Sequence, residues 1–155
     1  MLTAVRFILI SPVDMLSSHL TVTDLAYTFR QKTILHHVGF RAARYKITCL
    51  VGPSGSGKST VLRLINRLLE PPAASIMFDG LDVVTRPPEQ LRQEIGMVFQ
   101  HPMLFSGTLA DNIRFGPSMR GERLTDSEVR QWLDSVSLPA SWLDQPIDTL
   151  SGGET

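Results

Sequence analysis

The sequence of 155 residues has a single cysteine, Cys49, and no apolar run that approaches the roughly 20 residues of a membrane-spanning helix. A lone thiol cannot form an internal disulfide, which is typical of proteins from a reducing compartment. The charges show no bias, because 15 basic residues balance 15 acidic ones. The protein therefore has no net field that would attract nucleic acid. We expect a cytoplasmic protein without a nucleic-acid partner, in which residues 1–18 form an N-terminal appendage.

One stretch carries the pattern of a phosphate-binding loop, which is a glycine, four residues and then Gly-Lys-Ser/Thr. Before it, the apolar run Ile47–Val51 predicts a buried strand in which Cys49 is a small buried hydrophobe. After it, apolar residues at helical spacing predict a helix that continues to Leu69. The predicted nucleotide-binding residues are Gly52, Pro53, Ser54, Gly55, Ser56, Gly57, Lys58, Ser59 and Thr60.

The residue types of this loop suit a nucleoside triphosphate with Mg²⁺. Glycines allow successive backbone N–H groups to point at phosphate oxygens, and the N-terminus of the helix adds its positive dipole end. Lys58 is expected to reach the β- and γ-phosphates, and the Ser59 hydroxyl to ligate Mg²⁺. Thr60 can donate to a phosphate from the next position. A flexible glycine turn beside a lysine is the alternative, and the strand–loop–helix context disfavours it.

The rest of the chain predicts a β-rich core followed by helices. An apolar helical stripe through Val136 follows a capping box at Thr125 and Glu128. Pro87 and Pro88 open a shorter helix. The further expected strands are Leu20–Leu25, Ile34–Phe40, Ser75–Phe78 with a turn at Asp79-Gly80, and Ile95–Phe99, which ends at Gln100.

A second glycine motif lies near the end of the sequence, where a serine and two glycines precede an acidic residue. Such a tripeptide is equally consistent with a plain loop that enters a helix. It can also bind phosphate, because glycines allow close backbone approach and a helix N-terminus would face the anion. The candidate residues are Leu150, Ser151, Gly152, Gly153 and Glu154.

The order of these motifs over residues 19–155 resembles the ATP-binding cassette (ABC) family of ATPases. The resemblance implies an α/β fold with an ABC-type phosphate-loop core, an antiparallel β arm and the start of a helical subdomain. It assigns residues 19–107 to the nucleotide-binding core, 108–150 to the helical subdomain and 150–155 to the signature motif. Phe29 would stack on the adenine, with Tyr27 less typical in spacing. Gln100 would contact Mg²⁺ and the attacking water.

The same resemblance implies partners and a place in the cell. ATP would bridge Lys58 of one copy and Ser151 of another in a homodimer. A transmembrane permease subunit would dock near the apolar segment Met103–Thr108, which places the protein on the inner face of the cell membrane. The amino-acid sequence of the segments Leu91–Gln100 and Gly107–Pro117 is similar to that of bacterial iron-exporter ATPases and of a plant ATPase subunit linked to aluminium tolerance. Metal ion export is the transport class that this similarity indicates.

The sequence departs from the family pattern at three places. Tyr45-Lys46 stands where the family has Gly-Glu, and Ala74 stands where it has a turn glycine. The sequence also stops at Thr155, before the strand with the Asp-Glu pair and before the switch histidine. In the family that strand lies beside the phosphate-loop strand. We expect this chain on its own to bind ATP weakly and to hydrolyse it negligibly.

Three alternatives remain open at this point. A soluble ABC-class ATPase of translation or DNA repair would usually carry tandem cassettes, coiled-coil arms or zinc-bearing insertions. A small-molecule kinase would need a basic lid and no Leu-Ser-Gly-Gly-Glu. A nonfunctional truncated chain would have no Asp-Glu strand encoded after Thr155.

Overall fold

The computed structural model describes residues 18–100 and 103–150. The chain divides into two compact units, residues 1–97 and 98–155. In the described part of the chain, no helix is both long enough and apolar enough to span a membrane.

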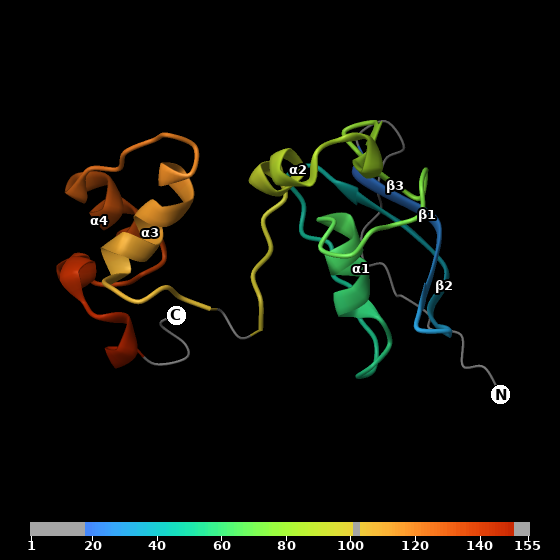
Figure 1. Cartoon of the computed structure of the whole chain (residues 1–155), viewed down its shortest axis with the longest axis horizontal. Helices are drawn as coiled ribbons and strands as arrows, with labels where there is room; N and C mark the ends of the chain where they lie inside the picture. The colour runs from blue at the N-terminus through green and yellow to red at the C-terminus, as the bar shows by residue number, and fades with distance from the viewer. Residues whose placement is uncertain (1–17, 101–102, 151–155) are drawn as a thin grey trace. The chain divides into compact units, whose positions relative to one another are not determined.

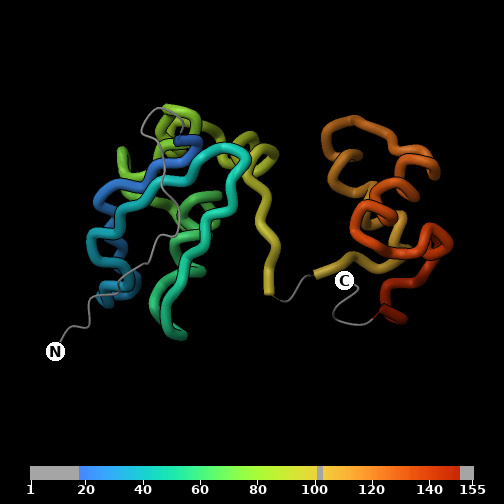
Figure 2. The backbone as a smooth tube through the Cα atoms, turned by 180° about the vertical axis from the view of Figure 1, so that it is seen from behind, coloured from blue at the N-terminus to red at the C-terminus, as the bar shows by residue number. Residues whose placement is uncertain are grey.

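The first unit contains a four-stranded antiparallel sheet of order β2-β1-β3-β4. Its long hairpin, at the blue end of the colour scale, is seen from opposite sides in Figures 1 and 2. The sheet confirms the expected β arm and the strand near Phe78. The turn at Asp79-Gly80 is confirmed by positive φ at both residues, which a tight hairpin turn requires. The strands are β1 (Ser18–Phe29), β2 (Lys32–Ala43), β3 (Ile76–Phe78) and β4 (Leu81–Asp82), followed by a 3₁₀-helix at Val83–Thr85.

Helix α1 (Lys58–Ile65) packs its apolar side into the core of this unit. Val61, Leu64 and Ile65 are buried at the i, i+3, i+4 spacing of one helical face. They meet buried residues of the sheet and Leu91 of α2 (Pro88–Glu94). Burial of a side chain of this size contributes about 1.5–3 kcal/mol.

Helix α1 ends four residues before the expected Leu69. The backbone turns at Arg67, whose φ is +54°. The guanidinium of Arg92 donates to the carbonyl oxygens of Asn66 and Arg67 at 3.2 and 2.6 Å. It thereby satisfies acceptors that a helix C-terminus leaves open. A tertiary contact therefore fixes the end of the helix, and the apolar spacing alone could not show it.

Two strand predictions were wrong. Ile47–Val51 and Ile95–Phe99 are not assigned to strands, and neither belongs to a ladder within residues 18–100 and 103–150. Ile47 is 87% exposed and Val98 is 94% exposed. Cys49 is also exposed, which contradicts its expected burial. A strand needs a hydrogen-bonded neighbour as well as apolar side chains, and the sheet of this unit supplies none here.

The second unit is helical. Its elements are α3 (Leu109–Ser118), α4 (Asp126–Ser135) and 3₁₀-helices at Ala140–Asp144 and Ile147–Thr149. The predicted capping box at Thr125 and Glu128 is confirmed, and α3 begins with a second one at Thr108 and Asp111. The backbone N–H of Thr125 donates to the carboxylate of Glu128 and holds its pKa below the usual value. Ala110, Val129 and Leu143 form the buried core.

Candidate nucleotide-binding site

The backbone of the phosphate loop has a shape that only glycine allows at its last turn. Gly57 is the N-cap of α1 with a φ of +92°. A Cβ on Gly57 would lie 2.5 Å from the Cδ2 of Leu35, a fully buried residue of β2. Gly55 also has positive φ, at +76°. The loop is therefore pressed against the sheet at Gly57, and no side chain fits between them.

The side chain of Lys58 lies within the curve of the loop. Its ammonium donates to the carbonyl oxygens of Gly52 and Pro53, both at 2.8 Å. It also donates to the Oγ of Ser56 at 3.4 Å. Three N–H donors thus converge on oxygen atoms inside one turn of backbone, and the same turn bears the helix N-terminus. A phosphate bound here would take over these donors from the oxygen atoms of the loop, and it would also face the helix N-terminus.

One hydroxyl residue of the loop supports it, and the others, including exposed Ser54, are accessible. Ser56 is buried, and a Cβ on Gly52 would lie 2.9 Å from its Oγ, so the loop is tightly wound there. Ser59 is exposed and Thr60 half-buried at the first turn of α1. Within the described residues, no group of three or more His, Cys, Asp or Glu could hold a metal ion. A lone hydroxyl suits Mg²⁺, which is usually shared between a few protein oxygens and substrate phosphates.

An apolar cavity of about 190 Å³ adjoins the phosphate loop. Phe29, the last residue of β1, is 50% exposed and lines this cavity. Thr60 connects the cavity to the phosphate loop, because it belongs to both. The volume is below the roughly 300–1,000 Å³ of sites that enclose a whole small molecule, so that the cavity suits one flat group. Its lining residues are Tyr27, Phe29, Ile34, Thr60, Arg63 and Leu69.

The other predicted site residues lie in the second unit or outside the described residues. Gln100 is exposed at a bend of the second unit. Leu150 is half-buried directly after the last 3₁₀-helix. Ser151, Gly152, Gly153 and Glu154 lie outside the described residues. The roles of Gln100 and of the signature motif stay predictions.

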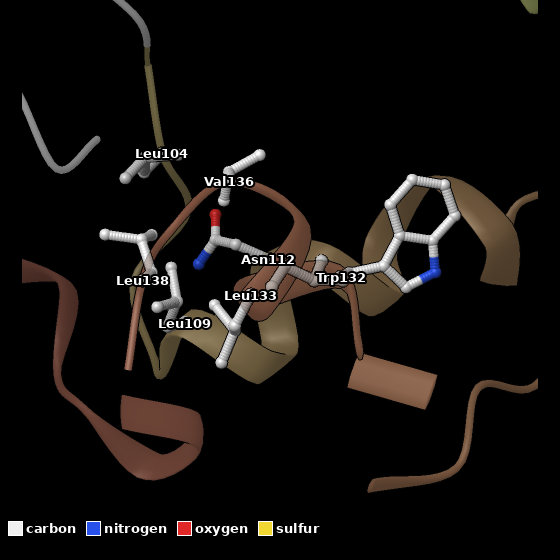
Figure 3. Close-up of a pocket in the computed structure, with 8 residues that line it drawn as sticks. Leu104, Leu109, Asn112, Trp132, Leu133, Val136 and Leu138 are labelled. Atoms are coloured by element: carbon white, nitrogen blue, oxygen red, sulfur yellow. The ribbon is translucent and has the colours of Figure 1, made fainter. Parts of the chain in front are cut away.

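The second unit has an apolar surface of its own. A pocket of about 290 Å³ lies between α3 and α4, and Figure 3 shows the side chains that line it. The ring centroids of Phe105 and Phe115 lie 4.2 Å apart, and Met103, two residues before Phe105, is exposed. Asn112 fixes this segment, because its amide accepts from the N–H of Phe105 at 2.8 Å and donates to its carbonyl at 2.9 Å. The sequence motifs did not single out Asn112. The pocket residues are Leu104, Leu109, Asn112, Ile113, Trp132, Leu133, Val136 and Leu138.

Comparison with known proteins shows which family the chain resembles in sequence and in fold. Residues 35–155 match the model of the ABC transporter family. The chain is 46% identical over 121 residues to ABC transporter I family member 17 of Arabidopsis thaliana, covering 78% of this chain and 46% of that protein. It is 35% identical over 137 residues to the Probable iron export ATP-binding protein FetA of Escherichia coli, covering 87% of this chain and 60% of that protein.

A solved structure shares the fold. The cbiO1 protein of Clostridium perfringens, part of the ABC transporter complex cbiONQ, superimposes with a TM-score of 0.72 at 28% identity. That match covers 88% of this chain and 57% of the solved one. The chain thus spans 46% to 60% of the length of these three proteins.

Proposed function

We propose that this chain, which belongs to the ABC transporter family, is the nucleotide-binding part of a transporter ATPase. Such an ATPase would couple ATP binding and hydrolysis to translocation. The observation that carries the proposal is the ammonium of Lys58, held inside a loop of backbone that admits only glycine at its closing residue. Nucleotide binding is what this family has in common. The identity of the nucleotide as ATP, the use of Mg²⁺ and the partners are parts of the proposal.

The residues of the loop have separate roles in this proposal. Lys58 holds the phosphate end through charge-assisted hydrogen bonds, which are about twice as strong as neutral ones. Backbone N–H groups at the start of α1 face the same anion. Ser59 offers its hydroxyl to Mg²⁺, which supplies positive charge to neutralise the phosphate oxygens. Gln100 is proposed to orient the attacking water.

Hydrolysis by this chain alone is proposed to be negligible. The sequence contains no strand that ends in an Asp-Glu pair after the signature motif, and that pair supplies the general base in the family. ATP binding by these 155 residues can then be measured apart from turnover. A turnover comparable to that of ordinary ATPases, if it depends on Lys58, would contradict this part of the proposal.

Pairing and membrane association rest on surfaces outside the loop. A homodimer would bring Ser151 of one copy to the triphosphate held by Lys58 of the other. The exposed apolar residues Met103 and Phe105 support docking to a membrane permease subunit, since such clusters usually find a partner. The protein would then lie on the inner face of the membrane. Recovery of the protein only in the soluble fraction of its own cells would argue against docking. Metal ion export stays a prediction for the transported substrate.

The test of nucleotide binding is Lys58→Met, which keeps most of the length of the side chain and removes its charge. Hydrogen bonds to charged groups contribute about 1.5–3 kcal/mol, so ATP binding should weaken by about 10- to 100-fold. Lys46→Met is the matched control, because Lys46 is exposed and outside the loop. Its affinity for ATP should stay within about twofold of the wild type. An equal effect of the two substitutions in an equilibrium titration would refute the proposed site.

A further inference from the structure

The turn that follows Phe29 has an unfavourable backbone for its sequence. Phe29 pairs with Lys32 across the hairpin, so that Arg30 and Gln31 are the two central residues of the turn. Their φ angles are +46° and +66°. Two-residue turns with positive φ at both positions strongly favour Asn-Gly, Asp-Gly or Gly-Gly. This chain instead holds two long side chains in a conformation that L-residues rarely adopt.

The side chain of Arg30 has a defined place despite this strain. Its guanidinium carbon lies 5.4 Å from the centroid of the Phe29 ring, within the range of a cation–π contact. Phe29 lines the 190 Å³ cavity beside the phosphate loop, whereas Arg30 is not among the lining residues. The guanidinium therefore contacts the ring without lining the cavity.

We propose that Arg30 is a positioning residue for the nucleobase. Its guanidinium supports the ring of Phe29, so that the free side of the ring can stack on a base bound in the cavity. This inference rests on the proposed function, because the phosphates of that nucleotide would be held by Lys58. Arg30 holds in place a ring that is half exposed. Strained backbone conformations cluster at positions where the side chain has a function. The contact of the Arg30 guanidinium with the ring of Phe29 is such a function.

The test compares two substitutions in the same turn. Arg30→Asn and Gln31→Asn each place a residue that tolerates positive φ at a strained position. Both variants should therefore be at least as stable towards urea as the wild type. Only Arg30→Asn removes the cation from Phe29. It should bind ATP about two- to fivefold more weakly, while Gln31→Asn binds ATP as the wild type does.

Inorganic tripolyphosphate separates the base from the phosphates. It has no base, so its affinity should be unchanged in Arg30→Asn when both ligands are titrated with Mg²⁺ into the 155-residue chain. Arg30→Lys keeps a cation near the ring and should recover at least half of the lost ATP affinity. Unchanged ATP binding by Arg30→Asn overturns the inference, and so does an equal loss for ATP and tripolyphosphate, which would make Arg30 a phosphate contact.

The two levels of proposal fail in different ways. A wild-type chain that binds tripolyphosphate as tightly as ATP retains its phosphate site but has no base platform, which overturns the role of Arg30 alone. A wild-type chain that binds neither ligand has no working phosphate loop, which overturns the proposed function and the role of Arg30 with it.

Discussion

Replacement of Gly57 by alanine tests how closely the phosphate loop is pressed against the sheet. Two costs add in this variant. A left-handed backbone costs about 1–2 kcal/mol for a residue with a Cβ. The new methyl would lie 2.5 Å from the Cδ2 of Leu35, and overpacking of a filled core costs about 1–3 kcal/mol. Gly57→Ala should therefore lower the free energy of unfolding by about 2–5 kcal/mol.

A double-mutant cycle with Leu35→Val separates the two costs. Leu35→Val removes one methylene from a fully buried site and should cost about 1 kcal/mol alone. It also makes room for the methyl of Gly57→Ala, so the double variant should be more stable than the sum of the single effects predicts, by about 1–3 kcal/mol. The backbone strain at φ +92° remains in the double variant.

Urea unfolding followed by two probes measures this cycle. Both tryptophans, Trp132 and Trp142, lie in the second unit, whereas far-ultraviolet circular dichroism reports both units. The substitutions should move the circular dichroism transition of the first unit. Tryptophan fluorescence then serves as an internal reference. Additive effects of Gly57→Ala and Leu35→Val would refute the contact between the loop and β2.

Two further predictions concern strained or charged turns. Ala74 has a φ of +60° where the family has glycine, so Ala74→Gly should raise the free energy of unfolding by about 1 kcal/mol in urea. Its control, Ala73→Gly, should lower it, and a gain from both would contradict the backbone assignment. Arg44, and after it His19, hold the pKa of Asp79 below its usual value. Asp79 therefore stabilises the fold above its unfolded pKa of about 3.9, and this stability is lost as the pH falls through the lower folded pKa. The urea midpoint of Asp79→Asn should change less than that of the wild type below about pH 4, and parallel curves would speak against the ion pair.

Local patterns predicted what depends on neighbours in the sequence. The capping box at Thr125 and the turn at Asp79-Gly80 place their donors and acceptors within a few residues, and both are confirmed. The glycine motif likewise predicted a loop followed by a helix, and α1 begins at Lys58. These features need no knowledge of the tertiary fold.

Features that depend on distant residues were missed or wrongly predicted. Arg92 ends α1 from 25 residues away, and the guanidinium of Arg30 over Phe29 follows from a turn geometry that Arg-Gln does not favour. Ile47–Val51 was predicted as a buried strand because its composition is that of one. Its burial would require strands on either side, and hydrophobic composition does not reveal whether they are present.

The segments before and after the phosphate loop differ in how well they are packed. After the loop, Val61 and Leu64 are fully buried and Gly57 abuts Leu35. Before the loop, the Oγ1 of Thr48 is buried without a hydrogen-bond partner in the described part of the chain. Thr48 and Gly96 border one cavity of about 360 Å³. Both wrongly predicted strands reach this cavity.

An extended segment in that cavity would satisfy several needs at once. It would offer partners to the backbone before the loop and to the hydroxyl of Thr48, since buried polar groups are nearly always paired. The resemblance to ABC ATPases places the strand with the Asp-Glu pair beside the phosphate-loop strand. The absence of such a ladder among the described residues accounts for the exposed run before the loop. In this structure, the residues proposed to bind the phosphates are shaped by the sheet and α1 on one side of the loop, and within the described residues no ladder covers the other side.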